Sequence, residues 1–268
     1  AIAYTWIKED TYDKDYLETH AVGFENFKTV FSNSGSIVSA RLFMSVLGWT
    51  LIWAFFATFL NFFCGLFLAM VINRKTTHGV PQFVSLLVMH QMLQPQGAIN
   101  RILMNWGWID NPMPFFTDAT WARVTVIVIN LWVGIPYTIM QVTGILQNIP
   151  ADQYEAAEID GANWWQIFTK ITMPYIIFVL TPYLITTFTG NVNNFNVIYL
   201  LTRGDPAVVG DSAGKTDLLI TWLYKLTVDN NDYNLGAVIG IMTFVVLAVV
   251  SLITYRSSGS YKNEEAFR

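Results

Sequence analysis

Long apolar segments alternate with short polar ones over most of this chain. Four apolar stretches contain no Asp, Glu, Lys or Arg: residues 42–73, 124–151, 171–202 and 233–255. In a fifth, 80–104, the only basic side chains are those of His90 and Arg101. Each can hold the helix of about 20 residues that crosses a bilayer. The pattern predicts five membrane-spanning helices, over residues 42–72, 80–104, 124–146, 175–201 and 235–255.

These apolar segments are predicted to be helices rather than strands. Runs such as Leu51–Phe56 are continuously apolar, whereas a membrane strand alternates between apolar and polar positions. Composition agrees, because 53% of the 268 residues are hydrophobic and 13% are charged, against about a quarter charged in soluble domains. The chain is therefore predicted to be an all-α integral membrane protein.

The polar segments suggest two parts and an orientation. Residues 1–41 are interpreted as an extracytoplasmic segment with an amphipathic helix over 22–31, and residues 42–268 as the transmembrane domain. Five spans put the ends of the chain on opposite sides of the membrane. The side that holds the polar loop 150–174 also holds several basic residues, so the positive-inside rule makes it cytoplasmic. These residues are Arg74, Lys75, Arg256, Lys262 and Arg268.

The loop 150–174 has the pattern of a helix–turn–helix insert between the third and fourth spans. Pro150 and Pro174 each suit the first turn of a helix, where a missing N–H costs nothing. Gly161 permits a tight or left-handed bend before a second short helix over 163–170. Such an insert suits a mechanical contact better than a reaction site.

The most polar patch inside a predicted span covers residues 186–196. Amides within a bilayer need partners, so they face other helices or a wet cavity. The number of Asn residues favours a cavity, and hydrogen bonding between helices stays as the alternative. Asn191 and Asn194 are expected to share one helical face, and Gly134 and Pro136 predict a kink in the third span. Amides, hydroxyls and aromatic faces without fixed charge suit an uncharged sugar.

Other chemistry is excluded by residue type and spacing. The three histidines lack the spacing of metal ligands, and Cys64, the one cysteine, cannot form an internal disulfide. Residues 210–216 imitate a phosphate-binding loop, but Val209 stands where its first glycine belongs. A nucleophile motif and a long basic run are both lacking in the sequence. We expect no catalytic or metal-binding residue, no cofactor on this chain and no nucleic-acid partner.

The insert also carries a recognisable spacing, in Glu155-Ala156-Ala157, Gly161 and Ile171-Thr172-Met173-Pro174. It resembles the signature loop of ABC-importer permeases, with Met173 in place of a leucine. From about Val22 to its end, the chain most resembles the larger permease of maltose and maltodextrin importers. The further stretches that carry this similarity are 130–137, 191–195, 200–202 and 216–219.

The resemblance implies a core of six transmembrane helices, the first of which is absent here, and a cytoplasmic coupling helix. It implies that a set of insert residues couples the permease to an ATPase: Glu155, Ala156, Ala157, Asp160, Gly161, Ile171 and Pro174. It implies that sugar contacts come from Val133, Gly134, Tyr137, Gly190, Asn191 and Asn194.

The implied partners are a second permease subunit, two ATPase subunits that hold ATP and Mg, and an extracytoplasmic solute-binding protein. A neutral oligosaccharide, most similar to maltodextrins, would be the cargo, and lipid would surround the spans. The chain would be a non-enzymatic permease of the bacterial cytoplasmic (inner) membrane that works by alternating access.

Three alternatives stay open. An ion-coupled secondary transporter would normally need an intramembrane carboxylate, which four spans lack. An intramembrane enzyme would need a nucleophile–base pair or a metal set. A permease for another solute is the third, although the uncharged spans argue against ionic cargo. Two departures from the maltose type bear on these choices: Gly190 stands where an aromatic ring is usual, and the turn 73–79 is short.

Overall fold

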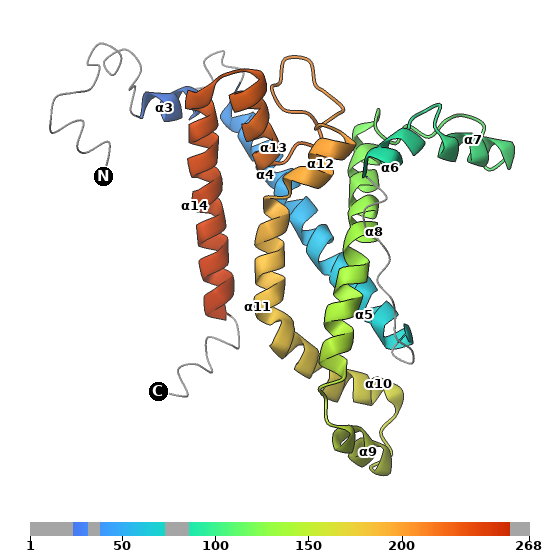
Figure 1. The fold of residues 1–268 in the computed structure, drawn as a ribbon. Coiled ribbons are helices and arrows are strands. Elements are labelled where there is room, and N and C mark those ends of the chain that lie inside the picture. The colour runs from blue at the N-terminus through green and yellow to red at the C-terminus, as the bar shows by residue number, and fades with distance from the viewer. Residues whose placement is uncertain (1–23, 32–37, 73–85, 258–268) are drawn as a thin grey trace.

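The structure is a computed structural model that describes residues 24–31, 38–72 and 86–257, in which every regular element is a helix (Figure 1). This confirms the predicted all-α membrane fold. Four helical segments of the described part are long and apolar enough to cross a membrane: Ala40–Val71, Ala119–Leu146, Trp164–Leu201 and Tyr233–Ile253. In hydrocarbon, a helix satisfies all of its own backbone polar groups, which explains why these runs fold this way.

The first span consists of α4 (Ala40–Phe55), a π-helical turn η1 (Phe56–Leu60) and α5 (Asn61–Ile72). Ser39 begins it, because its hydroxyl accepts a hydrogen bond from the backbone N–H of Leu42 at 3.2 Å. A π-helical turn inside an α-helix often marks a functional position, and η1 lies at mid-span.

The third predicted span is α8 (Ala119–Leu146), which packs along α5. It begins before the predicted Val124 because the Asp118 carboxylate caps it, accepting from the N–H groups of Thr120 and Trp121. Pro136 lies inside the helix, which continues beyond it.

One predicted span is corrected, and a second, described next, contains a break. The stretch 80–104 is not one continuous helix: its described part forms α6 (Leu86–Met92) and α7 (Ala98–Asn105), separated by a turn with Pro95 and Gly97. Proline and glycine disfavour helix continuation there, and residues 80–85 lie outside the described part.

The stretch 175–201 forms α11 (Met173–Val192) and α12 (Phe195–Leu201). Helix α12 starts anew because the Asn194 side chain accepts from the N–H of Val197 at 3.3 Å, which is an N-cap. Asn191 and Asn194 are therefore not on one continuous helix as predicted, although Asn194 Nδ2 lies 3.5 Å from Asn191 Oδ1.

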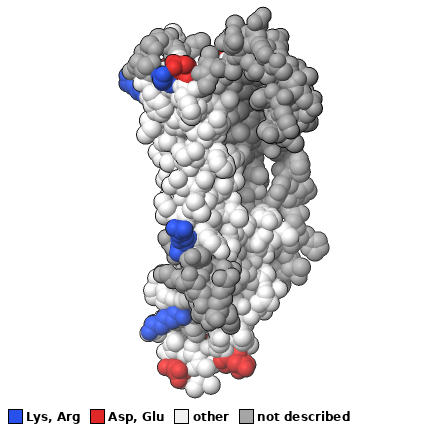
Figure 2. Space-filling model, turned by 90° about the vertical axis from the view of Figure 1, so that its left-hand side faces the viewer, with Lys and Arg blue, Asp and Glu red and all other residues white. Residues whose placement is uncertain are grey.

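The short helices lie at the two ends of the bundle (Figure 1). One end, with α3 (Glu25–Phe31), α6, α7, α12 and α13 (Leu219–Tyr224), is called the outer end. The other, with α9 (Ala151–Ile159) and α10 (Trp164–Ile167), is called the inner end, and α14 (Tyr233–Ser257) runs toward it from the outer end. Figure 2 shows an uncharged band between charged ends, with acidic side chains at the inner tip and basic ones above them.

Buried side chains form three clusters along the bundle. The middle cluster contains Trp53, the outer one Trp222 and the inner one Ile176, and all three side chains are fully buried. The inner cluster joins α5, α8 and α11, so the helices that flank the insert form one packed unit.

Candidate functional site

A polar cavity of about 380 Å³ lies between the first span, α8 and α11. Its lining is made of amides, hydroxyls, two tyrosine rings and some apolar groups, and it contains none of the charged side chains of the described residues. The lining residues are Thr58, Asn61, Phe62, Asn130, Val133, Gly134, Tyr137, Thr138, Tyr183, Leu184, Thr186, Thr187 and Asn191. The volume falls within the usual range for small-molecule sites.

Four of the six predicted sugar-contact residues line this cavity. Val133, Gly134 and Tyr137 come from α8, and Asn191 comes from the last turn of α11. The ring of Tyr137 lies 6.2 Å from that of Tyr183, measured between centroids, and the two rings are tilted by 45°. These rings provide apolar faces beside the amides.

Asn191 also joins helices. Its side-chain Nδ2 donates to the Thr58 hydroxyl at 2.9 Å, and its backbone carbonyl oxygen accepts from Trp53 Nε1 at 3.0 Å. The packing role that sequence reasoning kept as an alternative is therefore real, and it coexists with a place on the cavity wall.

The other two predicted contacts are not among the residues that line the cavity. Asn194 Nδ2 donates to Asn130 Oδ1 at 3.4 Å and its Oδ1 caps α12. Gly190 is exposed, and a Cβ added there would meet nothing within 4 Å. Their contact with a sugar stays a prediction.

The sequence-based analysis missed Thr58 and Asn61, which bring the first span into the cavity wall. Both are polar residues in a long apolar run and are three positions apart, so they share a helical face. That spacing was the available signal. Asn130 was noticed only as part of a similar stretch.

Five of the seven predicted coupling residues lie on α9 and in the turn that follows it, at the inner tip. Glu155, Ala156, Asp160 and Gly161 are exposed, and within the described part of the chain Glu155 has no ion-pair partner. Gly161 has φ +76°, a left-handed conformation that favours glycine. Helix α10 then begins with a reciprocal capping box between Asn163 and Gln166.

The insert is attached firmly to the spans. Ile171 and Phe168 pack against the inner cluster, and the hydroxyls of Tyr154 and Thr172 lie 3.2 Å apart. The second insert helix does not end at Lys170 as predicted but continues through a π-helical turn, η2 (Phe168–Thr172), into α11. Because the backbone is helical throughout, a displacement of α10 would be transmitted directly to α11.

A network of hydrogen bonds around an ion pair, centred on Asp217, lies at the outer end. Its buried carboxylate accepts from Lys225 Nζ at 2.6 Å, the Gly214 N–H at 2.7 Å and the Thr221 hydroxyl at 2.9 Å. The Gly214 N–H is thus already bonded inside the segment that imitates a phosphate-binding loop. A Cβ at Gly204 would collide with this carboxylate.

The same segment is fastened to two spans. Trp49 Nε1 donates to the Thr216 carbonyl at 3.2 Å, and Arg123 Nε donates to the Lys215 carbonyl at 2.9 Å. The outer loop, α4 and α8 are therefore joined as one unit.

Burial raises the pKa of the Asp217 carboxyl, although the Lys225 ion pair opposes this shift. The folded chain therefore binds this proton more tightly than the unfolded chain. Binding of this proton stabilises the folded state. Its full contribution to the free energy of unfolding is present below the ordinary pKa of 3.8 and is lost as pH rises through the raised pKa of the folded chain. We expect Asp217→Asn to flatten the dependence of the thermal midpoint on pH above about 4.

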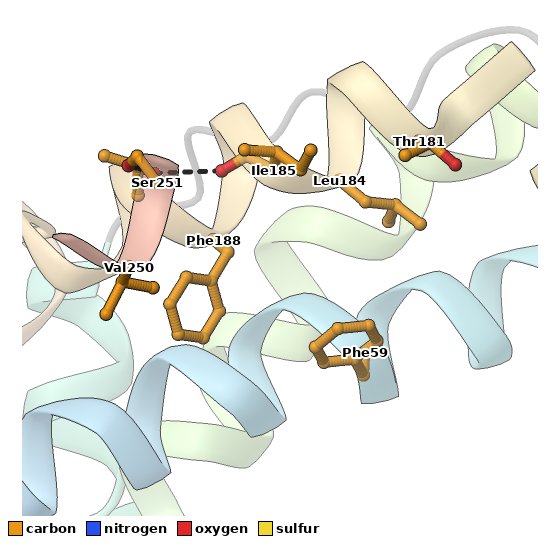
Figure 3. Close-up of a pocket in the computed structure, with 8 residues that line it drawn as sticks. Phe59, Thr181, Leu184, Ile185, Phe188, Val250 and Ser251 are labelled. Carbon is orange, nitrogen blue, oxygen red and sulfur yellow. Dashed lines mark hydrogen bonds between the residues drawn. The ribbon is translucent and has the colours of Figure 1, made fainter. Parts of the chain in front are cut away.

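A second hollow, of about 360 Å³, lies between α11 and α14, with Phe59 contributed by the first span (Figure 3). Its walls are mostly apolar, and its few polar groups include the hydroxyls of Thr189 and Ser251, which lie 3.4 Å apart. Such walls suit hydrocarbon better than a hydrated sugar.

Comparison with known proteins matches residues 27–259 to a family described as the inner membrane component of binding-protein-dependent transport systems. The galactooligosaccharides transport system permease protein GanP of Bacillus subtilis (strain 168) is 38% identical over 257 residues. The maltodextrin transport system permease protein MdxF of the same strain is 37% identical over 267 residues. Each alignment covers 91% of this chain and 60% of the relative, so this chain spans about 60% of their length.

A solved structure has the same fold. It belongs to a bacterial ABC transporter involved in the import of the acidic polysaccharide alginate, with a TM-score of 0.74 and 23% sequence identity. The match covers 90% of this chain and 85% of the other.

Proposed function

The chain belongs to the family of inner membrane components of binding-protein-dependent transport systems, and we propose that it is the permease subunit of an ATP-driven importer for a neutral oligosaccharide of the maltodextrin class. The predicted resemblance to importer permeases and the inner-membrane location are confirmed by this membership and by the named permease relatives. The particular sugar belongs to the proposal, because relatives of this chain serve different saccharides.

The observation that carries the proposal is the uncharged polar cavity. Hydroxyl-rich neutral solutes bind through amides, hydroxyls and aromatic faces, and these groups line it. An anionic sugar would need a cationic partner. In the described part of the chain the cavity lining offers none.

The proposed mechanism is alternating access between the two sides of the membrane. Two partner ATPases would bind and hydrolyse ATP, and their closure would push the insert at its exposed acidic tip. The α9–α10 insert is packed on the inner cluster and is continuous with α11. Its displacement would tilt α11, which carries Asn191, and change access to the cavity.

The direct test is uptake by proteoliposomes that contain the full-length protein with its second permease, its ATPases and its binding protein. ATP-dependent accumulation of maltotriose, without accumulation of an alginate trisaccharide, is the expected result. Uptake that requires an ion gradient instead of ATP, or uptake of charged sugars alone, would contradict the proposal.

The Asn191→Ala/Asn194→Ala double variant is expected to lower the kcat/KM of sugar uptake about tenfold. Each amide lost removes a hydrogen bond worth about 0.5–1.5 kcal/mol. The exposed Asn193, which lies between them, provides the matched control as Asn193→Ala. Copurification with the second permease checks assembly, and unchanged uptake kinetics in the assembled double variant would exclude these amides from the sugar path.

A further inference from the structure

The geometry points to Asn61, on the first span, as a sugar-binding residue that forms a hydrogen bond with one particular hydroxyl of the cargo. This inference rests on the proposed function and extends it, because the sequence resemblance places sugar contacts only on α8 and α11. It assigns the first span a direct part in selecting the cargo.

The main observation is an amide with unused hydrogen-bonding capacity at the cavity wall. Asn61 lines the polar cavity, and its Oδ1 is buried without a hydrogen-bond partner. An unpaired buried acceptor costs about 1–3 kcal/mol, so such atoms are rare unless another state or a ligand satisfies them. Among the described residues it is the one buried side-chain nitrogen or oxygen left unsatisfied.

Three neighbouring polar groups in the cavity are already engaged. The Thr58 hydroxyl accepts from Asn191, Asn130 Oδ1 accepts from Asn194, and the Thr138 hydroxyl donates to the Gly134 carbonyl at 3.3 Å. Asn61 therefore differs from these neighbours, because a turn of its carboxamide that brings Oδ1 to the cavity breaks no hydrogen bond of that oxygen within the protein.

Close packing fixes where this amide lies. A Cβ at Gly134 would collide with the Asn61 carboxamide, so the amide occupies the space that any side chain at position 134 would take. Gly134 is thus needed for the placement of Asn61, apart from any contact of its own with a sugar.

The carboxamide matches a sugar hydroxyl chemically. Oδ1 accepts and Nδ2 donates, and a half-turn of the amide exchanges the two. A hydroxyl is both donor and acceptor, so either orientation gives a bond. An apolar position at this point of the ligand would leave the amide unsatisfied, which is how a polar site rejects an analogue without the hydroxyl.

The test uses the reconstituted importer with maltotriose and a series of maltotrioses that each lack one hydroxyl. Wild-type protein and Asn61→Leu are compared with the same binding protein, so its own preferences cancel. We expect Asn61→Leu to lower kcat/KM for maltotriose about tenfold and to leave one deoxy analogue unaffected. Asn61→Gln should restore part of the loss, and Asn111→Leu, at an exposed outer position, should change nothing.

An equal loss for every analogue, or no loss for any, would overturn the inference while leaving the proposed function intact. Failure of the wild-type importer to take up maltotriose or any other neutral oligosaccharide would overturn both.

A second measurement does not depend on transport. Gly134→Ala should reduce the yield of assembled complex, and Asn61→Ala in the same chain should restore it by removing the collision. If the double variant assembles no better than Gly134→Ala alone, the placement of Asn61 against Gly134 is wrong.

Discussion

Glu155→Lys is expected to abolish most ATP-driven uptake while the protein still folds and inserts. Glu155 is exposed on α9 at the inner tip, and within the described part of the chain it pairs with no cation. If it docks on a basic residue of the ATPase, reversing its charge replaces attraction with repulsion, at a cost of about 2–5 kcal/mol. Uptake should therefore fall at least about 30-fold.

The measurement compares sugar uptake with ATP hydrolysis in the same proteoliposomes, with copurification of the ATPases as a third readout. Asp229→Lys makes the same charge change at an exposed position between α13 and α14, whose junction lies at the outer end, and serves as the matched control. A basic-to-acidic change on the ATPase should rescue Glu155→Lys. Normal uptake by Glu155→Lys would show that this side chain takes no part in docking.

Asp217→Ala is expected to lower stability by about 3–5 kcal/mol, because removing one partner of a buried ion pair leaves the other uncompensated. The Asp217 side chain is fully buried, and that of Lys225 is 21% exposed. The change also removes the acceptor for the Gly214 N–H and the Thr221 hydroxyl. Chemical unfolding in detergent micelles measures the loss.

Removing both charges of the ion pair should destabilise the protein less than removing one of them. Asp217→Leu combined with Lys225→Met removes both charges and is expected to destabilise less than Asp217→Ala. Asp211→Ala, at an exposed carboxylate of the same loop, should have little effect. If the double variant were the less stable one, the network would stabilise the outer end by its net attraction instead.

Helix breaks were predicted less well than the helices themselves. The stretch 175–201 is uniformly free of charge, so hydropathy merges α11 and α12, whereas in the structure the helix breaks at Asn193 and Asn194, and the Asn194 side chain accepts from the Val197 N–H to begin α12. The Asp217 network escaped prediction for a related reason. Thr221 in α13 and Lys225 in the π-helical turn after it follow Asp217 at helical spacing, but Gly214 lies in the irregular loop, and no periodic pattern brings it to the carboxylate.

The sequence by itself determined that this is a helical membrane protein with a polar insert, because charge-free runs of this length have few stable alternatives in a bilayer. It also located the insert and most of the polar wall on α8 and α11. Only the tertiary structure decided that Thr58 and Asn61 of the first span meet those walls and that Gly134 makes room for an amide. Contacts between distant segments depend on how helices pack, and apolar helices in hydrocarbon pack by local shape, which composition does not record.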